Sequence, residues 1–476
     1  MRKTTALCLI VACVVGAWSA PRGATSAELA PGKKAEIRAL VRRALSKSPI
    51  PSASVAVVVD GELAYAEAFG LANLDPAKPA TTQTRYDIGS VSKQFTAAAV
   101  LLLAEDGKLS LDDKVGRFFP NLTGADKVTV RQLLSHTAGY PNYWEWFFLT
   151  DEMRRPIAPQ AIVDRWGARP LEFEPGSQWD YSNTNYTIAG RIAETVSGRP
   201  LRALLAERVF VPLGMTDVGD ADGVALTPTD ATRYGRNLLG PARPAQAPGR
   251  GWAFGAGGLS MSAADLARWD IGLIRRAPLP PSLYDQMTRE TVLKDGKGAG
   301  YGLGVYVDQV DGHQRIHHDG VAPGAMTENR IYPNDRMAIV VMTNGEFGRA
   351  NYAIADGLEA LLLGTTAPAE QPEHAAPKPP STLVRKLVAQ VRAGRLDRSR
   401  FTPEAGAFFT PETLADYHDS LARLGPPKRF VVIFEDRFAD TNVSLFELTW
   451  PDRRLLGKVK VRDNGTITEF SMIAPD

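Results

Sequence analysis

Ser90 and Lys93 are the residues whose types and spacing most clearly suggest chemistry. Residues three positions apart are neighbours on one face of a helix, so the lysine amine can reach the serine hydroxyl. A lysine held in a dry, crowded site can lose its proton and accept the proton of the serine. The pair therefore predicts a serine nucleophile with a lysine base. Most Ser-x-x-Lys tetrapeptides are solvated surface, so the prediction needs support from the rest of the chain.

The segment that must position this pair is strongly apolar. The run from Val91 to Leu103 is too apolar on every side for a surface helix, which predicts a buried helix at the centre of a domain. A buried helix can hold a catalytic group rigidly. Its N-terminus also offers backbone N–H groups close to the place where an oxyanion would form.

The length and composition allow more than one domain. A chain of 476 residues with 44% hydrophobic residues can bury a large core. The charged start from Met1 to Lys3, a short apolar run and small residues up to Ala27 predict a secretory signal peptide over residues 1–27. An alternative is a lipoprotein leader with Cys13 as the lipidated residue, whose apolar run would be very short. The predicted location is periplasmic or secreted.

Removal of this leader would leave a nearly neutral chain without cysteine. Both cysteines, Cys8 and Cys13, lie in it, so the mature protein would have no disulfide, thiolate metal site or cysteine nucleophile. The leader also carries three of the 55 basic residues, which leaves 52 against 53 acidic residues. This balance argues against nucleic-acid binding as the main role. No later segment approaches about 18 uninterrupted apolar residues, so no membrane span is expected after the leader.

Patterns at both ends of the main segment predict one antiparallel sheet with a helical insertion between its two halves. Helical spacing of apolar residues, turn dipeptides and capping residues locate the elements. The expected elements are a helix over 33–47, a hairpin at Asp60-Gly61, helices capped by Thr129 and Ser262, a hairpin around 333–335 and a helix over 352–363. The aromatic, irregular stretch 140–170, which includes Tyr143 to Phe148, fits a cleft wall and a small secondary core equally well.

The composition changes after residue 364. Residues 365–380 contain five prolines and few large apolar side chains, which predicts an extended linker. Amphipathic helices and several strands are expected beyond it, so residues 381–476 are predicted to form a small separate α+β domain without a catalytic constellation. The predicted division of the chain is a signal peptide at 1–27, a main domain at 28–364, the linker and this accessory domain.

Three further stretches support the Ser90–Lys93 prediction. They are Tyr181-x-Asn183, the glycine-rich turn and helix from Gly255 to Ala267, and the segment Ile316-His317-His318-Asp319-Gly320-Val321-Ala322-Pro323-Gly324. With Leu133 to Gly139, and in this order and spacing, they resemble the serine β-lactamase and penicillin-binding-protein superfamily, in its class C β-lactamase, esterase and D-peptidase branch. The resemblance covers about residues 35–365. It implies an α+β (or α/β) fold, in which an antiparallel sheet is flanked by helices and carries a helical subdomain.

The resemblance also implies roles for the site residues. Ser90 would be the acylated nucleophile and Lys93 its proton acceptor. Tyr181 would pass the proton to the leaving group, and Asn183 would orient the substrate through hydrogen bonds. Because the ordinary pKa of tyrosine is about 10, we expect neighbouring positive charge to assist Tyr181. Lys93 and a protonated His318 would share that charge.

The third motif departs from the family pattern. Its usual Lys-Thr-Gly is replaced here by His318-Asp319-Gly320. A lysine there helps to bind the carboxylate of β-lactams and of terminal D-amino acids, whereas histidine is shorter and mostly neutral at pH 7. The resemblance still implies that His318 contacts substrate and that Gly320 keeps the strand edge open. The N–H groups of Ser90 and Val321 would form the oxyanion hole.

The other histidines have simpler structural explanations. His136 lies in a predicted loop and is expected to be a structural hydrogen-bonding residue rather than a catalytic base. His317 and His318 are adjacent on a predicted strand, so only one can face the site, and the motif selects His318. The consecutive residues His317, His318 and Asp319 cannot easily ligate one ion, so no metal is expected. The resemblance requires no organic cofactor.

The resulting prediction is a serine hydrolase that acts through a Ser90 acyl-enzyme on esters, small amides or D-amino-acid peptides, with weak β-lactamase activity as a side reaction. Its partners would be small ester, peptide or β-lactam substrates, and the oligomeric state stays open. An alternative is a penicillin-binding or sensing module that is acylated without efficient turnover, because the sequence does not show a base for deacylation. A non-catalytic assembly protein would have no reason to keep Ser90, Lys93, Tyr181 and Asn183 together.

Overall fold

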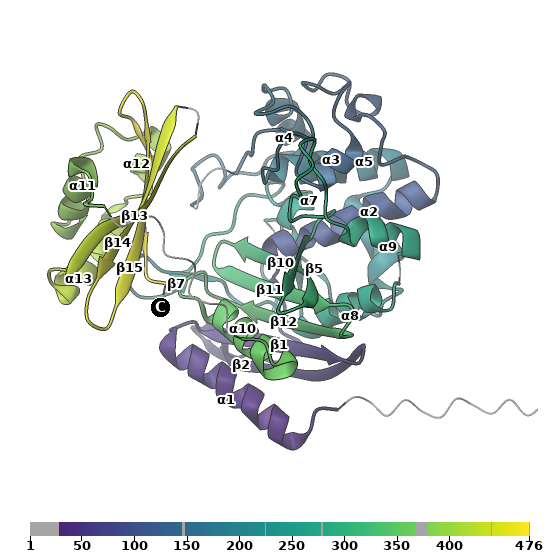
Figure 1. Ribbon diagram of the computed structural model, residues 1–476. Coiled ribbons are helices and arrows are strands. Elements are labelled where there is room, and N and C mark those ends of the chain that lie inside the picture. The colour runs from purple at the N-terminus through teal and green to yellow at the C-terminus, as the bar shows by residue number, and fades with distance from the viewer. Residues whose placement is uncertain are drawn as a thin grey trace, which may run out of the picture.

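Strands from both ends of the main segment pair in one antiparallel sheet (Figure 1). The computed structural model describes residues 28–144, 148–223, 225–277, 279–366, 378–438 and 440–475. The strands are β1 (Ser52–Val59), β2 (Glu62–Leu74), β3 (Ala77–Pro79), β9 (Tyr306–Val310), β10 (His313–Ala322), β11 (Ala325–Tyr332) and β12 (Met337–Thr343). Their order is β3-β2-β1-β12-β11-β10-β9, so β1 and β12 join the two ends of the segment at the middle of the sheet. The predicted antiparallel sheet is confirmed.

The remaining elements of the main domain include the helices that cover this sheet and the helical region between its halves. The helices are α1 (Pro31–Lys47), η1 (Gly89–Val91), α2 (Ser92–Glu105), η2 (Val115–Arg117), α3 (Val130–Leu134), α4 (Pro159–Trp166), α5 (Asn183–Ser197), α6 (Leu201–Leu205), η3 (Ala206–Phe210), α7 (Phe254–Gly257), α8 (Ala263–Ile274), α9 (Pro281–Thr288) and α10 (Ala350–Leu363). The short strands are β4 (Tyr86–Asp87), β5 (Gly219–Asp220), β6 (Tyr234–Gly235), β7 (Arg243–Pro244) and β8 (Leu259–Met261).

The period-two alternation of side chains explains why the sheet is covered on both faces. On β1, Val55 and Val57 pack into an apolar cluster with residues of α1 and α10. Ala56 and Val58, which point the other way, belong to the larger cluster that contains α2. Figure 1 shows α1 and α10 on one side of the sheet and α2, α5 and α7 on the other. The site therefore lies where the sheet meets the helical region.

Turns and caps take the conformations that the sequence predicts. Asp60 and Gly61 have φ values of 53° and 76°, as a two-residue type I′ hairpin turn requires. Thr129 forms a capping box with Gln132 at the start of α3, and the Ser262 side chain caps α8. The predicted buried helix is α2, in which every residue from Ser92 to Leu103 is buried. These local signals fix the elements that carry the site.

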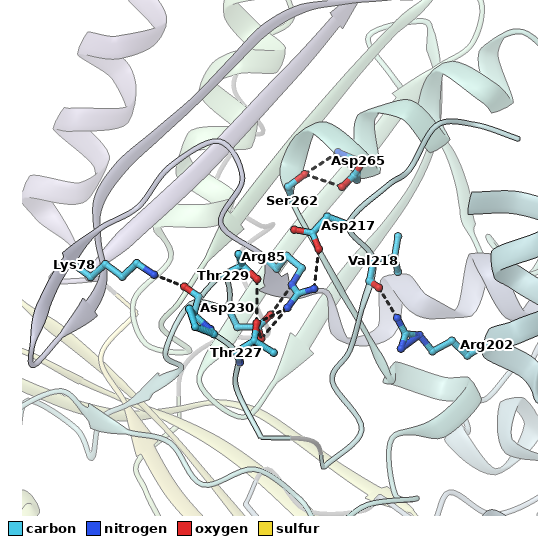
Figure 2. Close-up of polar contacts among 11 residues, drawn as sticks. Lys78, Arg85, Arg202, Asp217, Val218, Thr227, Thr229, Asp230, Ser262 and Asp265 are labelled. Carbon is cyan, nitrogen blue, oxygen red and sulfur yellow. Dashed lines mark hydrogen bonds and ion pairs between the residues drawn. The ribbon is translucent and has the colours of Figure 1, made fainter. Parts of the chain in front are cut away.

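The short strand β4, which leads into the nucleophile turn, is held in place by Arg85 (Figure 2). Arg85 Nε lies 2.8 Å from Asp230 Oδ1, and its Nη1 lies 2.8 Å from Asp217 Oδ1. Its Nη2 also donates a hydrogen bond to the Thr227 hydroxyl at 2.6 Å. The Arg85 side chain is 12% exposed, so loss of one carboxylate would leave a largely buried charge partly unpaired. This cluster fixes the loop after β5 against β4.

The last part of the described chain forms a second α+β unit, coloured green to yellow in Figure 1. Its strands pair antiparallel in sequence order, and its helices pack on them around an apolar cluster. The elements are α11 (Thr382–Arg392), α12 (Pro403–Ala407), α13 (Pro411–Leu424), β13 (Arg429–Phe438), β14 (Thr441–Thr449), β15 (Arg454–Arg462) and β16 (Ile467–Ile473). The predicted small α+β unit at the C-terminal end is confirmed.

Some predictions fall on residues that the structure does not describe. Residues 1–27 and 367–377 lie outside the described residues, so the signal peptide, most of the linker and the domain boundaries stay predictions. Lys378, at the end of the predicted linker, already pairs with Val432 through an isolated antiparallel bridge. Among the helices that the structure describes, none is long and apolar enough to cross a membrane.

A hairpin of the main domain packs into the C-terminal domain. The segment between β6 and β7 carries Leu238, which is buried within the apolar cluster of the C-terminal domain. Arg243 Nη1 lies 2.6 Å from Asp416 Oδ2 on α13, and Asn237 Nδ2 donates to the same oxygen at 3.0 Å. The sequence analysis did not identify this connection, because the hairpin segment has no periodic pattern. Side-chain packing thus joins the two domains.

Leu238→Ala should lower the free energy of unfolding of the C-terminal domain by about 2–5 kcal/mol, because it removes a buried apolar side chain. Leu226→Ala is the matched control, since Leu226 lies in the same connecting region and is 48% exposed; it should change the stability by less than about 0.5 kcal/mol. Chemical denaturation followed by tryptophan fluorescence measures both variants. Equal losses of stability would contradict the packing of Leu238 into the C-terminal core.

Candidate active site

Ser90 lies in the turn η1, directly before the buried helix α2. The carboxylate of Asp87 holds this turn through two hydrogen bonds. One oxygen accepts a hydrogen bond from the backbone N–H of Gly89 at 3.0 Å, and the other accepts one from Arg233 Nη1 at 2.8 Å. The side chains of Asp87 and Arg233 are each 7% exposed. Because a buried ion pair with further hydrogen bonds has little freedom, it holds the nucleophile turn in one geometry.

Lys93 is fully buried and has no ion pair with a carboxylate among the described residues. Burial lowers the pKa of Lys93 well below its usual value, and the charge of Asp319 opposes this shift. Lys93 Nζ lies 2.8 Å from Asn183 Oδ1, 2.8 Å from the Ala256 carbonyl oxygen and 3.1 Å from Ser90 Oγ. A neutral amine has two N–H groups and one lone pair. Both carbonyl oxygens need a donated hydrogen, so the lone pair faces Ser90.

Tyr181 stands beside this pair as a neutral phenol. It is hydrogen-bonded to Ser90, and Lys93 Nζ lies 4.8 Å from the centre of its ring. Burial raises the pKa of Tyr181 well above 10, although its hydrogen bond with Ser90 opposes the shift. The expectation that Lys93 and a protonated His318 would supply positive charge to Tyr181 is wrong. Burial lowers the pKa of His318 to about 4, so His318 is neutral at pH 7, and burial also disfavours the charged form of Lys93.

His318 is engaged through both nitrogens of its ring. Its Nε2 lies 3.0 Å from the Tyr301 hydroxyl, and its Nδ1 lies 2.6 Å from the carbonyl oxygen of Asp319. A carbonyl oxygen only accepts hydrogen bonds, so Nδ1 carries the hydrogen and Nε2 accepts one from Tyr301. Burial lowers the pKa of His318 to about 4. His318 therefore lies beside Tyr181 but offers no cation to a substrate carboxylate at neutral pH.

Asn183 is the first residue of α5, two residues after Tyr181. Its Oδ1 accepts from Lys93, while its Nδ2 and backbone N–H both point at Asn142 Oδ1, at 3.2 and 3.1 Å. Asn142 thus fixes which way the Asn183 amide faces. The sequence analysis missed Asn142, because it lies in the irregular aromatic stretch; its place just after the Leu133 to Gly139 motif was the one available signal.

Gly320 brings strand β10 into direct contact with the nucleophile turn. A Cβ atom at Gly320 would lie 1.9 Å from the carbonyl oxygen of Ile88, and one at Gly89 would lie 2.8 Å from the backbone nitrogen of Val321. Gly89 also has a φ of 48°, in the left-handed region that favours glycine. Neither position can carry a side chain without moving the strand away from Ser90.

The register of the β10–β11 hairpin sets the direction of the Val321 N–H group. Ala322 pairs with Ala325 across the two-residue turn 323–324, and Val321 pairs with Met326. Hydrogen-bonded and non-hydrogen-bonded pairs alternate in antiparallel strands, and the pair that closes a two-residue turn is hydrogen-bonded. The N–H of Val321 therefore points away from β11, toward the nucleophile turn. Its role in an oxyanion hole with Ser90 stays a prediction, which this geometry supports.

The ring of His136 packs against the ring of Tyr181. The two ring centres are 4.4 Å apart, and His136 Nδ1 accepts the backbone N–H of Ser182 at 3.2 Å. Burial lowers the pKa of His136 well below its usual value, so the ring stays neutral. This placement agrees with the structural role that the sequence suggests. No sequence pattern indicates Tyr301, the hydrogen-bond partner of His318.

The aromatic stretch 140–170 serves both of the purposes left open by the sequence. Tyr143 and Trp166 form a small secondary core with Trp252. Tyr143 and Phe148 also line a cavity that extends to Val321. Residues 145–147 of this stretch lie outside the described residues. The stretch is therefore both satellite core and cleft wall.

These contacts define the site of a serine hydrolase. A serine hydroxyl meets the lone pair of an unprotonated lysine, a tyrosine hydroxyl is hydrogen-bonded to the same serine, and a backbone N–H from a neighbouring strand points to the same place. Such a set of groups can form an acyl-enzyme with an ester or amide carbonyl. The structure brings together Ser90, Lys93, Tyr181, Asn183, His318, Gly320 and Val321.

Comparison with known proteins gives the family. The family model described as Beta-lactamase matches residues 37–364, and the chain belongs to this family. The chain is 28% identical over 334 residues to penicillin-binding protein 4* of Bacillus subtilis, which covers 67% of this chain and 73% of that protein. It is 29% identical over 335 residues to a D-aminopeptidase of Brucella anthropi, which covers 70% of this chain and 63% of that protein. The chain thus spans less than two thirds of the latter relative.

A solved structure extends the comparison to both domains. The octameric penicillin-binding protein homologue from Pyrococcus abyssi has a TM-score of 0.61 at 20% identity and covers 92% of this chain and 99% of its own. At 20% identity this structural similarity shows the fold alone. Because the match covers 92% of this chain, it includes most of the C-terminal domain. The predicted family, fold class and enzyme class, a serine hydrolase related to β-lactamases, are confirmed.

Gly320→Ala should lower kcat/KM by at least about 10²-fold, because the added methyl group meets the Ile88 carbonyl and moves an oxyanion-hole donor. Gly32→Ala is the control, since nothing lies within 4 Å of the new methyl group; it should leave kcat/KM within about twofold. Steady-state hydrolysis of an activated ester measures both variants. Wild-type kcat/KM in Gly320→Ala would show that the strand does not need to touch the turn.

Asn183→Asp should move the acid limb of the kcat/KM profile to higher pH. A carboxylate in place of the amide oxygen, 2.8 Å from Nζ, stabilises protonated Lys93 and raises its pKa. The neutral amine is the active form and prevails above that pKa. The variant should therefore lose at least about tenfold at neutral pH and recover at alkaline pH. Asn334→Asp, in an exposed turn, should keep the wild-type profile, and an unmoved acid limb in Asn183→Asp would contradict a neutral Lys93.

Proposed function

We propose that the protein hydrolyses small amides and esters, including amides and peptides of D-amino acids, through an acyl-enzyme on Ser90. The observation that carries the proposal is the set of hydrogen-bond partners of Lys93 Nζ. Two carbonyl oxygens occupy the N–H groups of its neutral amine, and the lone pair faces Ser90 Oγ at 3.1 Å. The D-aminopeptidase relative from Brucella anthropi supports the choice of D-amino-acid substrates.

Acylation begins when Lys93 Nζ takes the proton of Ser90 and Oγ attacks the carbonyl carbon. The negative charge moves to the carbonyl oxygen, which accepts hydrogen bonds from the N–H groups of Ser90 and Val321. As the tetrahedral intermediate collapses, the proton passes from Lys93 through the Tyr181 hydroxyl to the leaving amine or alcohol. Water then attacks the acyl-enzyme by the reverse path and releases the acid. Tyr181 relays the proton as a neutral hydroxyl that accepts one hydrogen and donates another.

Hydrolysis of β-lactams should be weak. The family's third-motif lysine is replaced by His318, whose pKa burial lowers to about 4. His318 therefore supplies no positive charge for the carboxylate of these drugs at neutral pH.

We also propose that residues 1–27 direct the protein to the periplasm or the outside of the cell, which N-terminal sequencing of the mature protein tests. A mature chain that still begins at Met1 would contradict this location.

The direct test compares wild type, Ser90→Ala and the surface control Ser46→Ala. D- and L-phenylalanine p-nitroanilide and p-nitrophenyl butyrate are the substrates, and intact-mass spectrometry follows the acyl-enzyme. Ser90→Ala should lose at least about 10⁴-fold in kcat/KM and form no adduct, while Ser46→Ala keeps wild-type values within about twofold. The D-anilide should be cleaved faster than the L-anilide.

Two outcomes would contradict this function. A stable Ser90 adduct without turnover would identify a penicillin-binding or sensing module instead of a hydrolase. Turnover that survives in Ser90→Ala would place the chemistry at another residue.

A further inference from the structure

A cavity of about 890 Å³ lies between the main domain and the C-terminal domain. On the main-domain side its lining includes Tyr143, Val321 and Pro323, and on the other side it includes Phe408 and Met472. Val321 supplies the predicted oxyanion-hole N–H, and its side chain is 54% exposed. A substrate held at the nucleophile turn can therefore extend from Val321 into this cavity.

Among the described residues, Arg236 in the lining of this cavity forms no ion pair with an acid. Arg236 follows β6, and its Nε and Nη2 are buried without a hydrogen-bond partner among the described residues. Its guanidinium group lies over the ring of Phe347, 4.8 Å from the ring centre. A desolvated guanidinium without an acceptor destabilises the folded protein. Such a group is explained when an anion of a ligand completes its hydrogen bonds.

Other arginines in the same lining are paired with acids of the protein. Arg154 pairs with Asp151, and Arg165 pairs with Glu152. Arg243 forms two hydrogen bonds with Asp416. The hydrogen bond with Asp416 raises the pKa of Arg243. In contrast, burial and the positive charge of Arg453 lower the pKa of Arg236.

Glu346 also lines the cavity but does not pair with Arg236 in the described part of the chain. Its Oε2 accepts the backbone N–H of Gly324 at 2.9 Å. Burial raises the pKa of Glu346 to about 7, so burial disfavours its charged form. Arg453, whose charge acts on Arg236, comes from the turn between β14 and β15 of the C-terminal domain. The surroundings of Arg236 are therefore short of negative charge.

We propose that Arg236 binds a carboxylate carried by the substrate, remote from the carbonyl that Ser90 attacks. The proposal rests on the proposed function and adds the class of substrate: amides or esters whose far end is an acid. His318 is neutral and hydrogen-bonded on both nitrogens, so it cannot hold that acid. In this protein Arg236, in the cavity between the domains, would thus take the role that the third-motif lysine has in the family.

The kinetic test uses mono-p-nitrophenyl esters of adipic, suberic and sebacic acid, each compared with the same ester whose distal carboxylate is methylated. At one or more chain lengths, wild type should prefer the free carboxylate by about 10- to 100-fold in kcat/KM. In Arg236→Gln this preference should fall toward one. In Arg154→Gln, which removes an arginine paired with Asp151 in the same cavity, the preference should stay within about twofold of wild type.

Binding is measured separately from turnover in the Ser90→Ala background, with monomethyl suberate as the probe and dimethyl suberate as its neutral match. Isothermal titration calorimetry should show at least about tenfold weaker binding of the carboxylate when Arg236→Gln is added. If turnover fails but this difference appears, the proposed function is wrong and the carboxylate site stands.

Two results would overturn the proposal itself. The first is a wild type without carboxylate preference at any chain length and without Arg236-dependent binding of monomethyl suberate. The second is a preference that Arg236→Gln leaves intact. Thermal unfolding gives a further readout: Arg236→Gln should unfold at the same or a higher temperature, because it removes an unpaired buried charge. A lower unfolding temperature together with an intact carboxylate preference would assign Arg236 a structural role instead.

Discussion

The site depends on one constraint, a lysine that is buried without an ion pair to a carboxylate among the described residues. An ammonium group at Lys93 would need either water or an acid, and the described surroundings offer two carbonyl oxygens and a hydroxyl. Desolvation therefore favours the neutral amine. The same burial disfavours the charged forms of Tyr181 and His318. Charge appears there only when Ser90 gives up its proton, and the backbone N–H groups stand where that charge goes.

The rest of the fold keeps these neutral groups in contact. The buried pair of Asp87 and Arg233 holds the nucleophile turn, while Gly89 and Gly320 let β10 approach it. Arg233 lies just before β6, and the hairpin after β6 packs Leu238 into the C-terminal domain. One segment thus connects the turn that carries Ser90, the unpaired Arg236 and the accessory domain. This continuity agrees with the cavity that residues of both domains line.

Local patterns were enough to predict much of this structure. Helix α2 could be predicted because its own residues are apolar on every side. The hairpin at Asp60-Gly61 could be predicted because its turn needs residues that accept positive φ. The residues of the family motifs were located by their order. Asn142, Arg236 and Leu238 could not be found, because their significance comes from partners far away in the sequence. The pKa shifts of the site could not be predicted either: the motifs place Tyr181 near two basic residues, but burial lowers the pKa of both.

The most direct test of this account is the ionisation of Lys93 itself. Protein labelled with ¹³C at the lysine ε-carbons can be titrated by NMR, with Lys93→Arg used to assign the resonance. Lys93 should titrate well below the usual lysine range and be neutral near pH 7. A Lys93 resonance that stays protonated up to pH 10 would contradict a neutral base beside Ser90, and with it the proposed route of the proton.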